Sequence, residues 1–287
     1  MPNLQQDCRK KRHKKNKTKI LPKIPLQTMP PLILHPTTTS NLQNLPIKNN
    51  PEYQQRDINN NPIGRMGTPC PNNPDIKEYL QALYRDLAKN YDVDFIQTCM
   101  VLFPDNYSRD GICYCESCQK GAKAMGFDMA AAIPVLRDNP FAQPQLEQAL
   151  KFRRASTTKI YKLVIESMRK ENPKIDFRLN DLNDRATGLC LEDLKTYVTS
   201  VHLSTHTEQL GYERSDRKSR IETTRYFMGP DVPIIPGVPV RILTTPAIVK
   251  SSIKISVDNG SRGIAIKHYD GASYSLLRAV RDGLHAA

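Results

Sequence analysis

Hydrophobic and polar positions along this chain of 287 residues alternate between two periods from about residue 70 onward. Five segments are apolar and β-branched, as is typical of strands covered on both faces. They are 93–103, 174–181, 198–205, 232–240 and 262–270. Segments with apolar residues at helical spacing lie between and around them, at 72–91, 145–171, 191–198 (a helix or a turn), 245–260 and 273–284. Strands that alternate with helices predict an α/β fold with a parallel sheet and right-handed crossovers.

The first of these helices has the clearest signals. Asn73 is suited to cap its N-terminus, and Pro74 fits the first helical position because proline has no N–H to lose there. Its expected inward face is formed by residues at helical spacing. They are Ile76, Tyr79, Leu80, Leu83 and Leu87.

The N-terminal part of the chain has a different composition. Residues 1–50 hold 10 Lys and Arg against one Asp, and so contribute +9 to the formal net charge of +13. A cationic run at 8–19 is followed by a segment rich in Pro, Thr and Asn, and neither has a helical or strand period. We therefore predict a disordered basic arm over 1–51 and one domain over 52–287. No aromatic residue interleaves the lysines, which favours a solvated tail over a nucleic-acid contact.

Membrane and secretory functions have little support in the sequence. Prolines interrupt the apolar residues at 20–34, so a continuous signal-peptide core is missing. No stretch has the length of a membrane span. The cysteine spacing is typical of a metal site in a reducing compartment rather than of a disulfide framework, and it favours a cytoplasmic location.

Three of the seven cysteines lie within six positions: Cys113, Cys115 and Cys118. Thiolates at this spacing can converge on one soft metal ion. A fourth ligand must come from elsewhere in the chain; we take Cys99, and Cys70 is the alternative. We therefore expect a structural zinc, and the competing interpretation is a group of reduced buried thiols.

Two long stretches resemble a known class of proteins. The sequence QRDINNNPIGRMGTPCPNNPDIKEYLQALYRDLAKNYDVDFIQ (55–97), followed by CYCESCQKGAKAMGFD (113–128), resembles the (β/α)8-barrel proteins known as hypothetical glycosyl hydrolases, family 6 in particular. Family 42 β-galactosidases carry a similar C-Y-C-x-x-C after their fourth strand, where the cysteines help bind a structural zinc. The ending GIAIKHYDGASYSLLRAVRDGL (263–284) is similar to the eighth strand and last helix of these barrels.

The resemblance implies that 93–103 is the fourth strand of such a barrel and 262–268 the eighth. The expected fold is thus an incomplete (β/α) barrel with about strands four to eight, in a truncated chain. Such a sheet exposes strand edges, through which the protein could self-associate. The resemblance also implies a carbohydrate as substrate or ligand.

Glycoside hydrolysis requires two carboxyl groups, and in these barrels they lie at the carboxyl ends of strands. The acids near such ends are Asp105, Asp181, Asp184, Glu208 and Asp270. We assign Glu208 and Asp181 as the catalytic pair. We expect His206, His268, Asp270 and Arg178 to bind substrate. Purely structural roles compete with these assignments: Asp181 as a loop or cap residue, Asp270 as a helix cap and His268 as an interior histidine.

The chain departs from the resembling families at two positions. Relatives place an acid in the fourth strand where this chain has Cys99, and no acid follows the strand at 232–240. Two usual catalytic positions are therefore unfilled. The alternative function is a non-enzymatic, zinc-stabilised α/β module that binds sugars or partners.

Overall fold

The structure is a computed structural model and describes most of the chain beyond residue 50. The described residues are 33–34, 51–63, 69–98, 103, 112–181, 187–204, 215–240, 244–267 and 269–287. The chain divides into two units, Met1–Pro31 and Leu32–Ala287, and every described residue belongs to the second. The division into an arm over 1–51 and a domain over 52–287 therefore stays a prediction.

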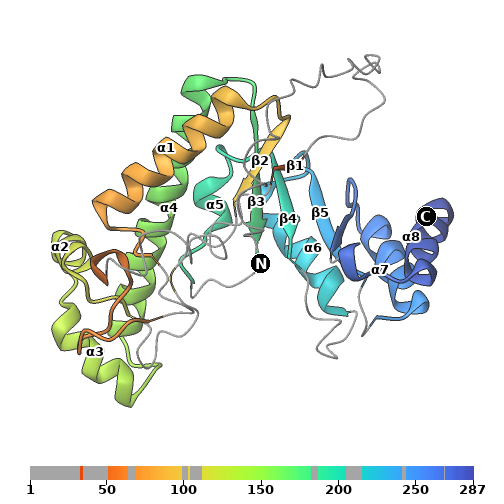
Figure 1. Cartoon of the computed structure of the whole chain (residues 1–287). Coiled ribbons are helices and arrows are strands. Elements are labelled where there is room, and N and C mark those ends of the chain that lie inside the picture. The colour runs from red at the N-terminus through yellow and green to blue at the C-terminus, as the bar shows by residue number, and fades with distance from the viewer. Residues whose placement is uncertain are drawn as a thin grey trace, which may run out of the picture. The chain divides into compact units, whose positions relative to one another are not determined.

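In the described part of the chain, six parallel strands form one sheet and follow one another in sequence order (Figure 1). They are β1 (Ile33–Leu34), β2 (Phe95–Thr98), β3 (Asp176–Asp181), β4 (Ser200–Leu203), β5 (Ile234–Pro239) and β6 (Ala265–Lys267). Sequential parallel neighbours joined by helical crossovers are the arrangement of a (β/α) barrel, which has eight strands when closed. The described part of the chain forms an incomplete barrel of this type, and the predicted α/β fold class is confirmed.

Strand β1 is a correction to the sequence analysis, which expects no strand before residue 52. Its two residues pair in parallel with the start of β2, Ile33 with Phe95 and Leu34 with Ile96. The edge of a sheet presents unpaired backbone N–H and C=O groups, and an extended segment can satisfy them whatever its own periodicity. β1 therefore lies beside the predicted fourth strand, on the side away from the predicted fifth.

Helices precede, connect and follow the strands. They are α1 (Pro74–Asn90), α2 (Glu116–Ala124), α3 (Met129–Asp138), α4 (Gln145–Glu171), α5 (Leu191–Leu194), α6 (Ser215–Met228), α7 (Pro246–Asp258) and α8 (Tyr274–Ala286), with 3₁₀ turns η4 (Pro51–Tyr53) and η7 (Tyr269–Gly271). The predicted helices correspond to α1, α4, α5, α7 and α8. Helices α2, α3 and α6 were not predicted.

Helix α6 was not predicted, because arginines occupy positions on the side of the helix that faces its neighbours. Arg217 and Arg220 are buried. Arg217 donates to the carbonyl oxygen of Gly237 at 3.0 Å, and Arg220 to that of Ser204 at 3.2 Å. Guanidinium groups thus bind the carbonyl oxygens of Gly237 within β5 and of Ser204 directly after β4, so α6 has no continuous apolar stripe for a periodicity search to find.

Helix α1 begins as its sequence predicts. The side chain of Asn73 accepts hydrogen bonds from the backbone N–H groups of Asp75 at 2.8 Å and Ile76 at 3.1 Å. Its inward face differs at one position: Tyr79 is 36% exposed, and Tyr84 is buried instead. The row of Ile76, Leu80, Tyr84 and Leu87 is buried, and α1 packs against α4.

Replacing Asn73 by alanine is expected to lower the free energy of unfolding by about 1 kcal/mol, because two N–H groups of the first turn lose their acceptor. Urea unfolding followed by circular dichroism measures this change. Ser273 caps α8 through one such bond, to the N–H of Leu276 at 3.4 Å. Its alanine variant is the matched comparison and should cost less. Equal or smaller destabilisation by Asn73→Ala would contradict the capping role.

Apolar side chains gather in three buried clusters. The largest lies between the sheet and helices α1 and α4, and joins strand residues to helix residues. Its strand members are Ile96, Phe177, Leu179, Val201, Leu203 and Ile234. A second surrounds the cysteines near α2 and α3, and a third joins β5 to α7 and α8. Because alternate strand residues contact the helices, the intervening residues lie on the opposite, inner face of the sheet.

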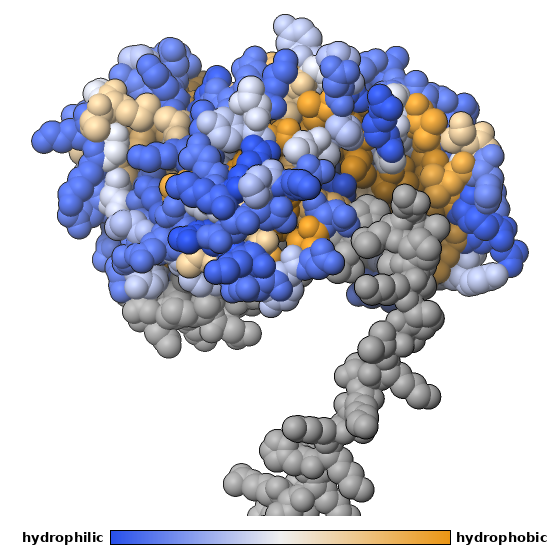
Figure 2. All heavy atoms as spheres, turned by 90° about the horizontal axis from the view of Figure 1, so that it is seen from above, coloured by the Kyte–Doolittle hydropathy of each residue, from blue (hydrophilic) through white to orange (hydrophobic). Residues whose placement is uncertain are grey.

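The surface is mostly hydrophilic in the view from above, with apolar side chains gathered towards one side (Figure 2). Among the described residues, large exposed apolar or aromatic side chains near the C-terminus are those of Ile266, Tyr269, Tyr274 and Leu284. Ile266 belongs to β6, whose described backbone pairing is with β5. Self-association through strand edges stays a prediction.

Candidate functional site

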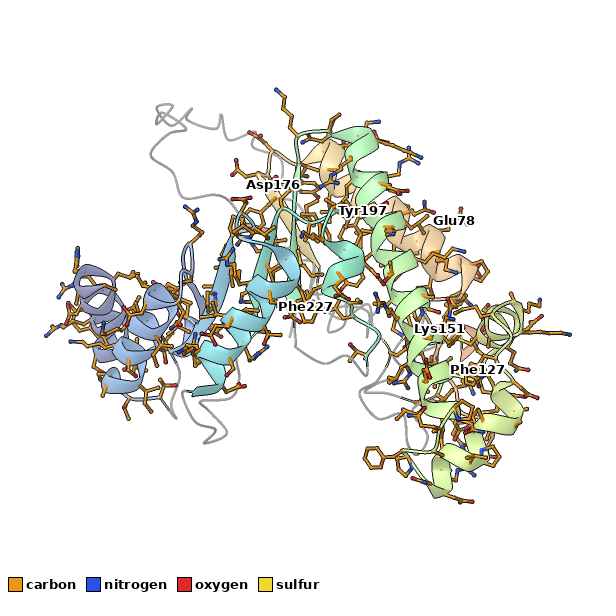
Figure 3. All side chains as sticks on the ribbon, turned by 180° about the vertical axis from the view of Figure 1, so that it is seen from behind. Glu78, Phe127, Lys151, Asp176, Tyr197 and Phe227 are labelled. Carbon is orange, nitrogen blue, oxygen red and sulfur yellow. The ribbon has the colours of Figure 1, made fainter. Side chains whose placement is uncertain are left out.

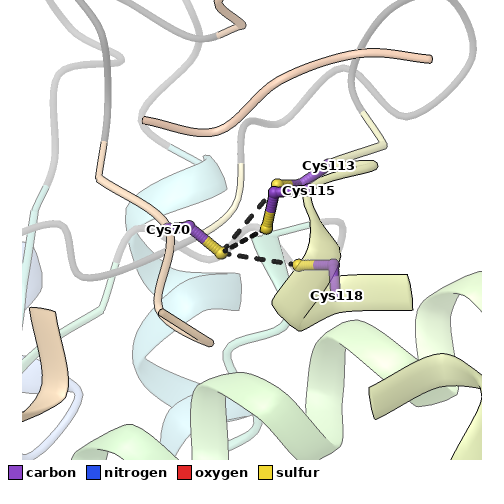
Figure 4. Close-up of side chains that lie close together, drawn as sticks. All are labelled: Cys70, Cys113, Cys115 and Cys118. Atoms are coloured by element: carbon purple, nitrogen blue, oxygen red, sulfur yellow. Dashed lines mark hydrogen bonds between the residues drawn. The ribbon is translucent and has the colours of Figure 1, made fainter. Parts of the chain in front are cut away.

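Four cysteines converge at one point of the structure (Figure 4). The Sγ atoms of Cys70, Cys113, Cys115 and Cys118 all lie within 4.8 Å of one another. The distance from Cys70 Sγ is 3.4 Å to Cys118, 3.5 Å to Cys115 and 3.9 Å to Cys113. Four thiolates bound to one tetrahedral ion at 2.3 Å would be about 3.8 Å apart. The cluster therefore has the dimensions of a metal site.

Two segments far apart in the sequence build this cluster. The backbone N–H of Cys70 donates to the carbonyl oxygen of Tyr53 at 2.8 Å. The N–H of Tyr114 donates to the carbonyl oxygen of Arg56 at 2.6 Å, which fixes the second segment against the first. Cys115 is the N-cap residue of α2, and Cys118 lies in its first turn. Backbone hydrogen bonds thus hold the two segments together, and the four thiols with them, independently of a bound metal.

Burial distinguishes the four thiols. Cys70, Cys113 and Cys118 are buried among apolar side chains, whereas Cys115 is partly exposed. Hydrogen bonds with Cys113 and Cys115, together with burial, raise the pKa of Cys70 and of Cys118. Hydrogen bonds with Cys113, Cys118 and Cys70 lower the pKa of Cys115. Cys115 is therefore the thiol of this cluster that solvent reaches.

Of the two candidates for the fourth ligand, Cys70 lies within the cluster. Cys99 lies outside the described residues. Cys190 is a free, partly exposed cysteine that is not part of the group. The residues present fit a metal ion, because four sulfur donors at tetrahedral separation are a set that soft or borderline cations prefer.

A second group of polar side chains lies on the inner face of the sheet. Gln97 of β2 and His202 of β4 approach to 3.1 Å between Nε2 and Nδ1, across the intervening strand β3. Asn180 of β3 lies beside His202 in the sheet register. Lys267, the last residue of β6, donates to Ser204 Oγ at 2.6 Å. All but Lys267 are buried, so the carboxyl end of the inner face is a polar lining.

Gly237 of β5 makes room for this lining. A Cβ atom at that position would lie 2.6 Å from Cε of Lys267 and 3.3 Å from Nε2 of His202. The lysine and histidine side chains therefore pass over the glycine from opposite sides. The sequence analysis missed Gln97, Asn180, Ser204 and Lys267. The sequence feature that could have identified them is a polar residue at alternate positions of an otherwise apolar strand.

The structure separates residues that the sequence analysis grouped. Asp181 is buried on the helix-facing side of β3, where Thr224 of α6 donates to its Oδ2 at 3.5 Å. Arg178 is on the inner face, deeper in the barrel: its guanidinium lies 3.7 Å from the ring centroid of Phe95 and donates to Ser200 Oγ at 3.1 Å. The two side chains are three positions apart on one strand and point to opposite faces.

The remaining predicted site residues occupy other places. Asp270 is exposed in the turn η7, directly before α8. Glu208, His206 and His268 lie outside the described residues, as does Asp184. Their assigned roles stay predictions.

Asp181 also borders a pocket of about 910 Å³ among α4, α5 and α6. Lys151 and Arg154 of α4 and Phe227 of α6 line it; Figure 3 labels Lys151 and Phe227 on their helices. Most of its lining residues come from these helices and from the segments next to them, on the side of the sheet that the Asp181 side chain faces.

Comparison with known proteins places the fold. No family model matches the chain, and no curated protein matches its sequence. Solved structures match over most of it. A β-galactosidase from the Antarctic haloarchaeon Halorubrum lacusprofundi has a TM-score of 0.64 at 12% identity, covering 88% of this chain and 48% of that one.

Two further structures agree with the first. A β-galactosidase from the psychrophilic Marinomonas ef1 has a TM-score of 0.59 at 9% identity, covering 84% of this chain and 47% of that one. A family 42 β-galactosidase from G. stearothermophilus has a TM-score of 0.56 at 14% identity, with 84% and 44% covered. This chain thus spans less than half the length of each. Its fold is that of the glycoside hydrolase barrels, in incomplete form.

No helix in the described part of the chain is both long and apolar enough to cross a membrane.

Proposed function

We propose that this protein is a glycoside hydrolase-like barrel that binds a carbohydrate at the carboxyl end of its strands, and that a structural zinc at the four cysteines stabilises it. The observation that supports binding is the polar lining of Gln97, Asn180, His202, Ser204 and Lys267. In (β/α) barrels the carboxyl ends of the strands carry the ligand site.

The chemistry of the lining suits sugars. Carbohydrates present hydroxyl groups that both donate and accept hydrogen bonds. Amide, imidazole, hydroxyl and ammonium groups supply matching donors and acceptors. Lys267 carries a positive charge and supplies only donors, so a ring oxygen, a hydroxyl or an acidic substituent would be its partner.

Binding without hydrolysis is the form of this function that the geometry favours. Hydrolysis requires two carboxyl groups on either side of the scissile bond. Asp181 faces the helices, so it is poorly placed to act across that bond with Glu208. If the chain does hydrolyse a glycoside, Glu208 remains our proposed essential acid. Its partner would then come from another position.

The proposed zinc site has a structural rather than catalytic composition. Four protein thiolates close a tetrahedral site, whereas catalytic zinc keeps one position for water or substrate. The cluster also lies within an apolar core. A structural role fits the position of the cluster, which joins Cys70 to the segment 112–118.

Galactosides are the first ligands to test, because three similar structures are β-galactosidases. We expect binding of a β-galactoside, measured by calorimetry, to weaken at least about tenfold in His202→Ala and Asn180→Ala, since each loses a hydrogen bond in a desolvated site. Gln81→Ala removes an amide of the helical layer, bonded to Ser167, and should leave binding unchanged. No binding of a panel of glycosides by the folded chain would refute the proposal.

Hydrolysis is tested on the same protein with aryl glycosides. We expect little or no turnover by the unmodified chain. General acid–base assistance is worth about 10²–10⁴-fold, so any genuine activity should fall by that much in Glu208→Gln. Robust hydrolysis that Glu208→Gln leaves undiminished would refute both the assignment of Glu208 and the preference for binding alone.

A further inference from the structure

One asparagine contacts two of the four clustered cysteines. The backbone N–H of Asn72 donates to Cys70 Sγ at 3.4 Å, and its side-chain Nδ2 donates to Cys118 Sγ at 3.4 Å. The same Nδ2 donates to Ser156 Oγ at 2.9 Å. Ser156 is buried on α4, so this helix holds the amide group in place. The contact therefore has a fixed orientation rather than that of a loose surface side chain.

A lysine supports Asn72 from the other side. Lys77 of α1 donates from Nζ to the carbonyl oxygen of Asn72 at 2.9 Å. This side chain is half-buried, and the clustered thiols are among the charges that act on it. Its ammonium group thus lies near the cluster without contacting any sulfur through a hydrogen bond that the structure shows.

The negative charge of a metal-bound cluster explains the role that Asn72 and Lys77 would have. A divalent cation held by four thiolates has a net charge of about −2. In a buried site this charge is costly unless hydrogen-bond donors or cations offset it. N–H groups directed at thiolate sulfurs spread the charge, and a nearby ammonium group opposes it.

We propose that Asn72 is a positioning residue of the metal centre: held by Ser156 and Lys77, it directs two N–H groups at Cys70 and Cys118 and thereby raises the affinity of the cluster for a divalent metal. The inference rests on the proposed metal binding. It adds the residues outside the ligand set that determine how tightly the metal is held.

The test uses the full chain, freed of metal and titrated with Co²⁺ and then with Zn²⁺ in competition. We expect Asn72→Ala to weaken the affinity for metal about 10–100-fold, as is typical when a hydrogen-bond partner of a ligand is removed. The sulfur-to-cobalt charge-transfer bands should also shift, because Cys118 Sγ loses the electron-withdrawing donor that the Asn72 side chain supplies, while the backbone N–H directed at Cys70 Sγ remains. Gln119→Ala is the control: Gln119 is adjacent to Cys118, but its side-chain amide donates to the Tyr114 carbonyl oxygen at 2.7 Å.

Ser156→Ala and Lys77→Met separate positioning from folding. Each leaves Asn72 in place and removes one of its supports, so each should weaken metal affinity less than Asn72→Ala does while the apoprotein keeps its circular dichroism spectrum. If Asn72→Ala fails to fold, these two variants decide: weaker metal affinity with a shifted cobalt spectrum supports the proposal, and wild-type affinity overturns it.

Metal binding by the four cysteines and the role of Asn72 can be disproved separately. If the wild-type chain takes up neither Co²⁺ nor Zn²⁺, metal binding is wrong and this inference falls with it. If the wild type binds both tightly and Asn72→Ala has the same affinity and cobalt spectrum, only the role of Asn72 is overturned.

Discussion

Replacing Cys118 by serine is expected to abolish stoichiometric zinc binding and to remove the stability that the bound metal contributes to the fold. Cys118 is fully buried and its Sγ lies 3.4 Å from that of Cys70. In a structural site the free energy of metal binding contributes directly to folding. A site with a Kd one-thousandth of the free zinc concentration stabilises the fold by about 4 kcal/mol.

The measurement is metal content together with urea unfolding, before and after treatment with a chelator. Wild-type protein should contain about one zinc per chain, following tetrahedral thiolate coordination. Chelation should reduce its stability to that of Cys118→Ser. The variant itself should not respond to the chelator.

Cys190→Ser is the matched control, since Cys190 is partly exposed and lies outside the cluster. It should retain the metal and the wild-type stability. Protein prepared without chelator that contains no zinc, or a Cys118→Ser variant as stable as the wild type, would contradict the structural metal site.

Replacing Gly188 by alanine is expected to destabilise the protein by about 2–5 kcal/mol. Gly188 has a φ of +86°, and an added Cβ would lie 2.5 Å from the backbone carbonyl oxygen of Arg153 and 2.6 Å from Thr157 Oγ1. The left-handed backbone costs a residue with a side chain about 1–2 kcal/mol. Forcing an extra methyl group against a helix backbone adds about 1–3 kcal/mol.

Gly126 separates the two costs. It has a φ of +71° but an added Cβ there would meet nothing within 4 Å. Gly126→Ala should therefore show only the conformational cost of about 1–2 kcal/mol. The midpoints of urea unfolding compare the variants. Equal destabilisation at both positions would show that the loop at 187–190 can move away from α4 at little cost.

The inner face of the sheet illustrates a limit of strand patterns. Phe177, Leu179 and Asp181 alternate with Arg178 and Asn180, so the sequence determines that the two sets lie on opposite faces. It does not say which face the helices cover. The structure shows that Phe177 and Leu179 pack against the helices, which puts Asp181 there too and leaves Asn180 on the inner face.

Prediction failed where local periodicity was weak. Helix α6 has the buried residues Arg217 and Arg220 at positions that face its neighbours, and their partners are the carbonyl oxygens of Gly237 and Ser204. Strand β1 has two residues and forms against the edge of β2. In both cases the partner that stabilises the element lies on another segment, so its own sequence carries little signal.

The sequence by itself determined the alternation of strands and helices, the capped start of α1 at Asn73, and the close spacing of three cysteines at 113–118. Each depends on interactions between residues a few positions apart, which a linear pattern records. Only the tertiary structure brought Cys70 to those thiols and Gln97 to His202. These contacts join residues 43 and 105 positions apart, and their geometry follows from how the whole chain packs.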